Sequence, residues 1–128
     1  MHFRYARHTN DIEPLKKFYV DILGLEVLGC FENHQSYNGI FLGKKGLNWH
    51  LEFTESKEKT DHTFDEDDIL VFYPESKQEI EQIEKRIKAN DIPIVEAQNP
   101  YWNENGTMIS DPDGHKVVIS PLKLKSNG

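Results

Sequence analysis

Two polar residues on a predicted strand, His50 and Glu52, have the types and the spacing that could carry out proton transfer. Side chains two apart in a strand point to the same face, so these two lie together while Leu51 and Phe53 form the opposite, apolar face. A histidine beside a carboxylate can serve as a general base. An ordinary solvent-facing stripe would show the same alternation, so the pattern leaves open whether this face borders a cavity or bulk water.

Two predicted loops could place aromatic and polar groups over a ligand. The segment NPYWNENG, Asn99–Gly106, holds Tyr101 and Trp102 between turn-forming residues. Their rings offer the stacking surface that a lid over an apolar or aromatic ligand would need, although covering a sheet edge or a dimer seam would use them equally well. A similar loop in the first half of the chain contains His34, Gln35, Ser36 and Tyr37.

The sequence shows no arrangement for nucleophilic catalysis. It contains no GxSxG, Walker-type loop, dinucleotide glycine pattern or CxxC pair. The single Cys30 stands between Leu28 and Phe31 in sequence, where we expect a buried and inert thiol. His115 follows the DPDG turn, and we expect it on the outside of that turn.

Composition argues against several classes of partner. The chain of 128 residues has a formal charge of −7 and no basic stripe on any predicted element, so nucleic acid is not expected as a partner. No apolar run approaches the roughly 20 residues of a membrane span, and no charged-then-apolar leader opens the sequence. One cysteine allows no internal disulfide. We therefore expect a cytoplasmic protein that does not bind membranes.

The first half of the chain predicts the order βαβββ. A strand near Phe3–Thr9 precedes a helix that Asn10 or Asp11 can cap and that Gly24 ends. Strand-like runs follow, at Glu26–Phe31, Gly39–Gly43 and Asn48–Thr54.

The second half predicts the same order. A short apolar strand at Ile69–Tyr73 precedes a helix from Ser76 to about Asn90, whose isoleucines recur at helical spacing. Three more strands are predicted, at Ile94–Ala97, Thr107–Ser110 and Lys116–Ser120.

The repeated order predicts an α+β fold in which a single domain is built from two modules. We place module one at about residues 1–55, a charged connection at about 56–67, module two at about 68–122, and a short tail after it. Each module would leave one face of its sheet uncovered, so we expect the two modules to bury those faces jointly.

Two long stretches resemble one superfamily of small proteins. DIEPLKKFYVDILGLEVLG (residues 11–29) and DPDGHKVVI (residues 111–119) are similar to the vicinal oxygen chelate superfamily, which includes glyoxalase I, extradiol dioxygenases, fosfomycin-modifying enzymes and bleomycin-binding proteins. The segments GIFLG, HLEFTE, LVFYP and NPYW resemble an uncharacterised bacterial branch of glyoxalase/bleomycin-resistance type. The resemblance implies a curved mixed sheet around a cavity, with helices on the outer face.

In metal-using members, the resemblance implies one metal ligand on each module's first strand and one on its last. Here those positions are Arg4, Glu52, Asp68 and Val118. A guanidinium carries only donors and repels a cation, and an aliphatic side chain holds none. We therefore expect Arg4 to pair with Glu52 in a bidentate, at least half-buried ion pair in place of a metal.

Strand register leaves alternatives open. A slip of one residue would turn Arg7 rather than Arg4 toward the cavity. An atypical metal site could instead be recruited from His8, His34, His50 and Glu52. In the second module, Phe72 should share a strand face with Asp68, and Tyr73 should point toward the helix.

The favoured function is a small-molecule binding protein that uses no metal and binds its ligand in the cavity between the modules. Arg4 would attract an anionic group, and Phe72, Tyr101 and Trp102 would hold the apolar or aromatic body of the ligand. The alternative is a metal-dependent lyase or dioxygenase with an atypical site at His50, Glu52 and Asp68. A third possibility is metal-free catalysis, in which Glu52 or His50 moves a proton and Arg4 stabilises an oxyanion. The resemblance also implies a homodimer.

Overall fold

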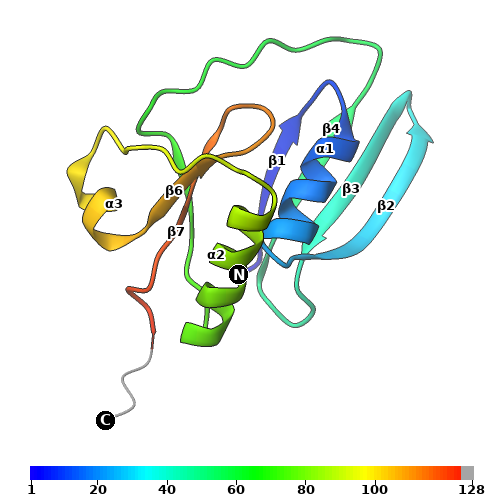
Figure 1. Ribbon diagram of the computed structural model, residues 1–128. Helices are drawn as coiled ribbons and strands as arrows, with labels where there is room; N and C mark the ends of the chain where they lie inside the picture. Colours follow the sequence, from blue (N-terminus) through cyan, green and yellow to red (C-terminus); the bar gives the residue numbers. More distant parts are fainter. Residues whose placement is uncertain (125–128) are drawn as a thin grey trace. The chain divides into compact units, whose positions relative to one another are not determined.

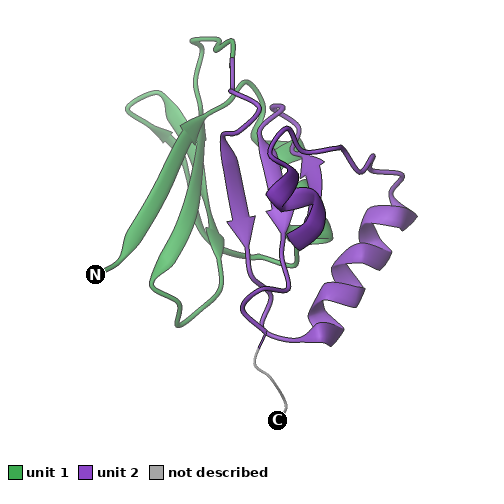
Figure 2. Cartoon of the chain, turned by 90° about the vertical axis from the view of Figure 1, so that its left-hand side faces the viewer, with its two compact units in different colours: residues 1–62 green, residues 63–128 purple. Residues whose placement is uncertain are grey.

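This computed structural model describes residues 1–124, which form two compact units (Figures 1 and 2). The first unit is Met1–His62, and the second begins at Thr63. Each unit contains helical segments and one sheet, of four strands in the first and three in the second. The predicted α+β fold with two modules is confirmed.

The first unit has the predicted βαβββ order. Its strands are β1 (Phe3–His8), β2 (Glu26–His34), β3 (Tyr37–Gly43) and β4 (Trp49–Glu55). They lie in the order β1-β4-β3-β2, with β1 parallel to β4 and the other pairs antiparallel. The last strand in sequence is therefore central, and β2 forms an edge.

The helical segment of this unit differs from the single α-helix that was predicted. Only α1 (Ile12–Lys16) is an α-helix, with Asp11 accepting a hydrogen bond from the Glu13 N–H at its start. It continues as η1 (Lys17–Ile22), a π-helix. Sequence periodicity could not reveal this change, because a stripe of apolar residues over six positions fits either helix type.

One face of the first sheet packs against these helical turns and forms the core. The ring of Tyr19 stacks on that of Phe53, with centroids 5.2 Å apart, and both residues are fully buried. Arg7 is also buried on this face: its Nε donates to the Tyr5 hydroxyl, and its guanidinium lies 5.2 Å from the Phe53 ring centroid. The aromatic rings thus enclose the charge of Arg7, and Arg4 points to the opposite face.

Cys30 does not have the predicted environment. It lies on β2, at the edge of the sheet, and is exposed. A strand at an edge has a neighbour on one side only, so an apolar sequence context does not ensure burial there.

In the second unit, β5 (Ile69–Phe72), β7 (Lys116–Ile119) and β6 (Thr107–Ser110) lie side by side in that order. The β5–β7 pair is parallel and the β7–β6 pair is antiparallel. A long helix, α2 (Lys77–Ala89), begins after Ser76, whose hydroxyl accepts from the Glu79 N–H. It buries Ile83 and Ile87, in agreement with the predicted apolar stripe.

Two predictions for the second unit are wrong. The segment Ile94–Ala97 is not a strand and contributes only a bridge from Val95 to Met108. The segment predicted as a loop forms a short helix, α3 (Pro100–Asn105). The side chain of Asn103 in this helix accepts from the Ala97 N–H at 2.7 Å and donates to the Ala97 carbonyl at 3.1 Å. These bonds occupy backbone groups that a continuing strand would use for pairing.

His115 is buried, contrary to the prediction that it lies outside the turn. Asp111 accepts backbone hydrogen bonds from Asp113 and His115, which folds the turn inward, and Gly114 takes a φ of 90° that favours glycine. The centroids of the His115 imidazole ring and the Phe64 phenyl ring lie 4.5 Å apart.

Candidate functional site

The second face of the first sheet gathers most of the predicted site residues of that unit. In the strand register, Arg4 pairs with His50, and Glu52 pairs with both Ala6 and Phe41. Residues paired across neighbouring strands point to the same side of a sheet. We call this side the Arg4 face, and it carries Arg4, Leu28, Phe31, Phe41, His50 and Glu52.

Arg4 is held on three sides. Its Nε donates to Nε2 of His50 at 2.9 Å, its Nη1 lies 3.8 Å from Oε1 of Glu52, and its guanidinium lies 5.3 Å from the Phe41 ring centroid. The Arg4 side chain nevertheless remains 51% exposed, whereas that of Glu52 is 14% exposed. Arg4 and Glu52 are brought together as predicted, but by one long contact, so the expected bidentate geometry is wrong.

These hydrogen bonds define the protonation of His50. Because Arg4 can only donate, Nε2 of His50 must accept, and Nδ1 then carries the proton that it shares with Nε2 of His2 at 2.7 Å. Burial, followed by the positive charge of Arg4, lowers the pKa of His50 from its ordinary 6.5. His50 is therefore a neutral residue that orients Arg4.

A row of aromatic rings crosses the Arg4 face. The centroids of His2 and His50 are 4.9 Å apart, those of His50 and Phe41 5.7 Å, those of Phe41 and Phe31 5.8 Å, and those of Phe31 and His34 6.1 Å. We call these five residues the ring row. The row includes His34 and His50, which the sequence had singled out.

Sequence reasoning missed Phe31 and Phe41, although GIFLG contains a signal for them. Gly39 and Gly43 flank Phe41 at a spacing of two, so all three lie on the same face, and the glycines leave room on that face for neighbouring side chains. The tip of the Phe31 ring covers Gly39, where a Cβ would collide with it. An aromatic residue between glycines at this spacing thus indicates that other side chains pack closely onto the strand beside it.

A second polar group lies at the far end of β1. Nδ1 of His8 lies 3.0 Å from the Thr54 hydroxyl, and its ring meets that of Tyr37 edge-on at 5.6 Å. The charged connection that follows β4 also contacts this end of the sheet. The side chain of Asn10 donates to the Thr60 carbonyl at 2.9 Å and accepts from the Thr60 N–H at 2.8 Å. The predicted site residue Tyr37 thus lies with His8 and is 43% exposed.

The predicted site residues of the second unit have other surroundings. Val118 is fully buried in an apolar cluster with Ala97 and Met108, against which Trp102 packs. Tyr101 is 48% exposed and touches Trp102 edge-on at 4.9 Å. Val71 pairs with Val118 and packs on the same cluster, so Phe72 points to the other face of β5.

A divalent metal does not fit the side chains at the positions that the superfamily uses for its ligands. The Arg4 guanidinium lies against Glu52, and Val118 supplies no donor. Oδ2 of Asp68 accepts a hydrogen bond from the Asp65 N–H in an exposed turn. Within residues 1–124, no three histidine, cysteine, aspartate or glutamate side chains gather as a metal ion would require.

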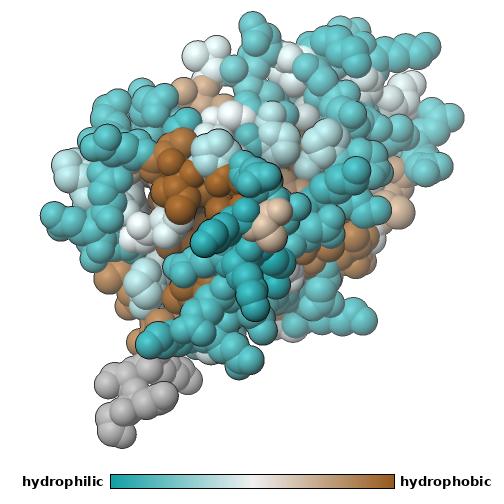
Figure 3. All heavy atoms as spheres, in the orientation of Figure 1, coloured by the Kyte–Doolittle hydropathy of each residue, from teal (hydrophilic) through white to brown (hydrophobic). Residues whose placement is uncertain are grey.

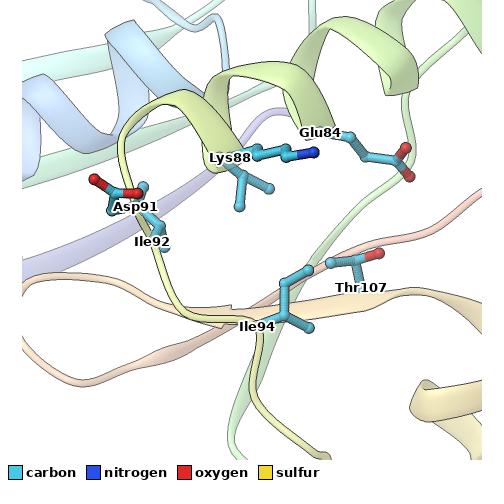
Figure 4. A pocket seen from close by; sticks show the side chains of 7 residues that line it. Glu84, Lys88, Asp91, Ile92, Ile94 and Thr107 are labelled. Atoms are coloured by element: carbon cyan, nitrogen blue, oxygen red, sulfur yellow. The ribbon is translucent and has the colours of Figure 1, made fainter.

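A separate groove of about 600 Å³ lies in the second unit beside the end of α2 (Figure 4). Its walls combine apolar and charged side chains, namely Ile87, Ile92, Ile94, Glu84, Lys88 and Asp91. The lining contains one ammonium group and two carboxylates, so it gives little preference for an anionic ligand. Hydrophilic residues cover most of the face seen in Figure 3.

Comparisons with known proteins cover both units. Residues 3–54 match a family model described as the YycE-like N-terminal domain, and residues 67–120 match that of the YycE-like C-terminal domain. The uncharacterized protein YycE of Bacillus subtilis (strain 168) is 35% identical over 124 residues, which cover 94% of this chain and 87% of the relative.

Solved structures extend the likeness to the whole chain. A crystal structure of a YycE protein of unknown function from Bacillus subtilis has a TM-score of 0.85 at 34% identity, covering 99% of this chain and 93% of that one. Trypanothione-dependent glyoxalase I of Leishmania major has a TM-score of 0.70 at 21% identity, with 91% and 83% covered. TnmS3, an antibiotic-binding protein of Streptomyces sp. CB03234, has a TM-score of 0.66 at 18% identity, with 98% and 96% covered. The latter two likenesses concern the fold alone.

None of the helices described in residues 1–124 is long and apolar enough to cross a bilayer.

Proposed function

This chain belongs to the YycE-like family and has the vicinal oxygen chelate fold, and on that premise we propose that it binds a small anionic molecule without a metal, on the Arg4 face. The observation that carries the proposal is the state of Arg4. Its guanidinium is oriented by His50 and Phe41 and is still half exposed. A fixed, accessible guanidinium is suited to a carboxylate or a similar anion.

The environment of Arg4 leaves room for a ligand anion. Glu52 lies at 3.8 Å from a single guanidinium nitrogen, which is a weaker pairing than two short parallel bonds would give. His50 is neutral and uses only Nε of Arg4. A ligand carboxylate can therefore reach the terminal nitrogens without displacing His50.

Binding is favoured over the metal-dependent lyase or dioxygenase because the donor set around Arg4 does not suit a cation. Both kinds of function occur on this fold: one neighbour is described as an antibiotic-binding protein and another as a glyoxalase. Fold alone does not choose between them. We keep Phe72, Tyr101 and Trp102 as proposed ligand contacts, in accordance with the sequence prediction.

The test is a titration with benzoate, followed by amide NMR and calorimetry. Charge-assisted hydrogen bonds are worth about 1.5–3 kcal/mol, so Arg4→Met should weaken binding at least about tenfold. Arg86→Met, which removes the same charge from α2, is the matched control and should bind as the original protein does. Equal affinity in Arg4→Met, or no binding of benzoate by the original protein, would overturn the proposal.

A second candidate is metal-free proton transfer on the same face. Glu52 has a largely buried carboxylate beside a guanidinium that could stabilise an oxyanion. Any turnover that is discovered should then show a pH profile that changes in Glu52→Gln. A profile that is identical in both proteins would exclude Glu52 as the base.

We also propose that the two units unfold as one domain and that the protein is a cytoplasmic homodimer. A single cooperative unfolding transition would support the first statement, and two separate transitions would contradict it. Light scattering after size exclusion gives the oligomeric state, and a monomer mass would contradict the dimer.

A further inference from the structure

The ring row points to a ligand class: we infer that the ligand is a planar aromatic monoanion, with its carboxylate at Arg4 and its fused rings over Phe41 and Phe31. This inference rests on the function proposed above. Neither the family model nor the similar proteins specify such a ligand for this chain.

The first argument is the continuity of the rings. Four successive centroid distances in the row lie between 4.9 and 6.1 Å, within the range over which aromatic groups attract one another. The row begins beside β1 and reaches the end of β2, so it crosses the sheet from one edge strand to the other. Neighbouring rings are inclined to one another by 46° to 80°, so a ligand ring system that follows the row meets ring faces and ring edges in turn, as aromatic groups prefer.

The second argument is that strand positions around the rings carry no side chain or a small one, so that the Phe31 ring lies directly on Gly39. Gly29, Gly39 and Gly43 all lie on the Arg4 face, and Ala6 beside Arg4 is exposed. Around Phe41 there are thus few side chains tall enough to keep a flat molecule away from the rings. Leu28, whose methyl group would touch a Cβ at Gly43, adds an apolar border.

The third argument concerns charge. Arg4 supplies one positive charge, Glu52 one negative charge at 3.8 Å, and His50 is neutral. A monoanion compensates Arg4 without strong repulsion from Glu52, whereas a dianion would bring a second negative charge close to that carboxylate. The guanidinium already lies over the Phe41 ring, so a ligand ring joined to the carboxylate falls next to Phe41.

The experiment compares four probes at pH 7.5 by calorimetry: cyclohexanecarboxylate, benzoate, 2-naphthoate and neutral 2-naphthamide. Stacking on an aromatic side chain strengthens binding by about fivefold or more per ring system, so 2-naphthoate should bind at least about fivefold more tightly than cyclohexanecarboxylate. Benzoate should fall between them. The neutral amide should bind at least about tenfold more weakly than 2-naphthoate, because it lacks the charge for Arg4.

Substitutions of Phe41 and Phe31 test whether these two rings cause the preference for 2-naphthoate over cyclohexanecarboxylate. Phe41→Leu and Phe31→Leu should each reduce the ratio of 2-naphthoate to cyclohexanecarboxylate affinity several-fold while leaving cyclohexanecarboxylate binding nearly unchanged. Phe3→Leu is the matched control, because Phe3 is 65% exposed and lies on the opposite side of β1. Amide NMR spectra establish that each variant is folded, and two separate phenylalanine positions keep the test valid if one variant is not.

The outcomes separate the two proposals. If cyclohexanecarboxylate binds as tightly as 2-naphthoate and loses affinity in Arg4→Met, the ligand class is wrong and the anion site stands. A preference that Phe41→Leu and Phe31→Leu leave intact would also overturn the ligand class. If no probe binds, both proposals fail.

Discussion

The two sheets of this protein have similar orders of strands and helices, but one face of each sheet has opposite surroundings. That face is partly exposed in the first unit and buried in the second. In the first unit, the face opposite the helical turns carries Arg4, His50 and Glu52 and remains partly exposed. In the second, the face of β7 that carries Val118 is sealed by Ala97, Met108 and Trp102. The comparison shows that one strand topology supports either a polar surface or a closed apolar layer, depending on the side chains.

The difference also extends to the strands themselves. The first sheet has its full four strands, whereas the second has three and a single bridge at Val95. Asn103 binds both backbone groups of Ala97, and α3, the helix that contains Asn103, also brings Trp102 onto the apolar cluster. The lost strand and the sealed face therefore have a common origin in the segment that includes α3.

The largest expected effect comes from placing a carboxylate at the sealed position. Val118→Glu should lower the free energy of unfolding by about 3 kcal/mol or more, because the charge would enter a fully buried apolar cluster. Urea unfolding measures this. The control Val27→Glu, at a position 44% exposed on β2, should change stability by less than about 0.5 kcal/mol. A stable Val118→Glu protein would contradict the closed nature of this face.

The two arginines on β1 provide the next contrast. Arg7→Ala should cost about 2–3 kcal/mol, because it removes a buried side chain from Tyr5 and Phe53 and leaves a cavity. Arg4→Ala should cost less than about 1 kcal/mol, since its ion pair is long and half exposed. Both values come from urea unfolding under the same conditions. Equal losses would show that the two faces do not differ as described.

A smaller effect tests whether Asn103 keeps the segment Ile94–Ala97 from forming a strand. Asn103→Ala should lower stability by about 1–2 kcal/mol, since the buried Ala97 loses two backbone hydrogen bonds. Asn90→Ala is the matched control; its side chain donates only to an exposed helix-end carbonyl. The measurement is thermal or urea unfolding. Losses of equal size in both variants would mean that the Asn103 bonds have no special role.

The smallest effect is the pH dependence of His50. Its pKa is lowered by burial first and by Arg4 second, so the unfolded chain binds the proton more tightly than the folded protein does. The contribution of His50 to stability is therefore complete above pH 6.5 and is lost as the pH falls through its folded pKa. NMR titration should show the His50 pKa rising toward 6.5 in Arg4→Met and unchanged in Arg86→Met. An unchanged value in Arg4→Met would contradict the contact between the two residues.

Most of the fold could be predicted from local patterns. Strand-like runs identified β1, β3, β4 and β7, and the capping candidates Asn10 or Asp11 and Ser76 placed both helix starts. Local patterns failed where a distant or tertiary contact decided the outcome. The Asn103 side chain occupies the backbone groups of Ala97 that a strand would use for pairing, and Cys30 is exposed because β2 is at the edge of its sheet.

The candidate site was predicted in part. Arg4, His50 and Glu52 were named and do meet on one face, because two-residue spacing fixes which side chains of a strand lie together. Phe31 and Phe41 were missed, because their contribution depends on which strands lie next to each other. The role of the residues named in the second unit is still a prediction.

By itself, the sequence determined that Arg4 and Arg7 lie on opposite faces of one strand, since they are three positions apart and strand side chains alternate. Only the tertiary structure decided which of them is buried. That choice depends on the helical turns that cover one face and bring Tyr19 onto Phe53, and on the register that sets His50 beside Arg4. Alternation is a local property of the chain, whereas the choice of face and of neighbouring strand arises from contacts between segments more than thirty residues apart.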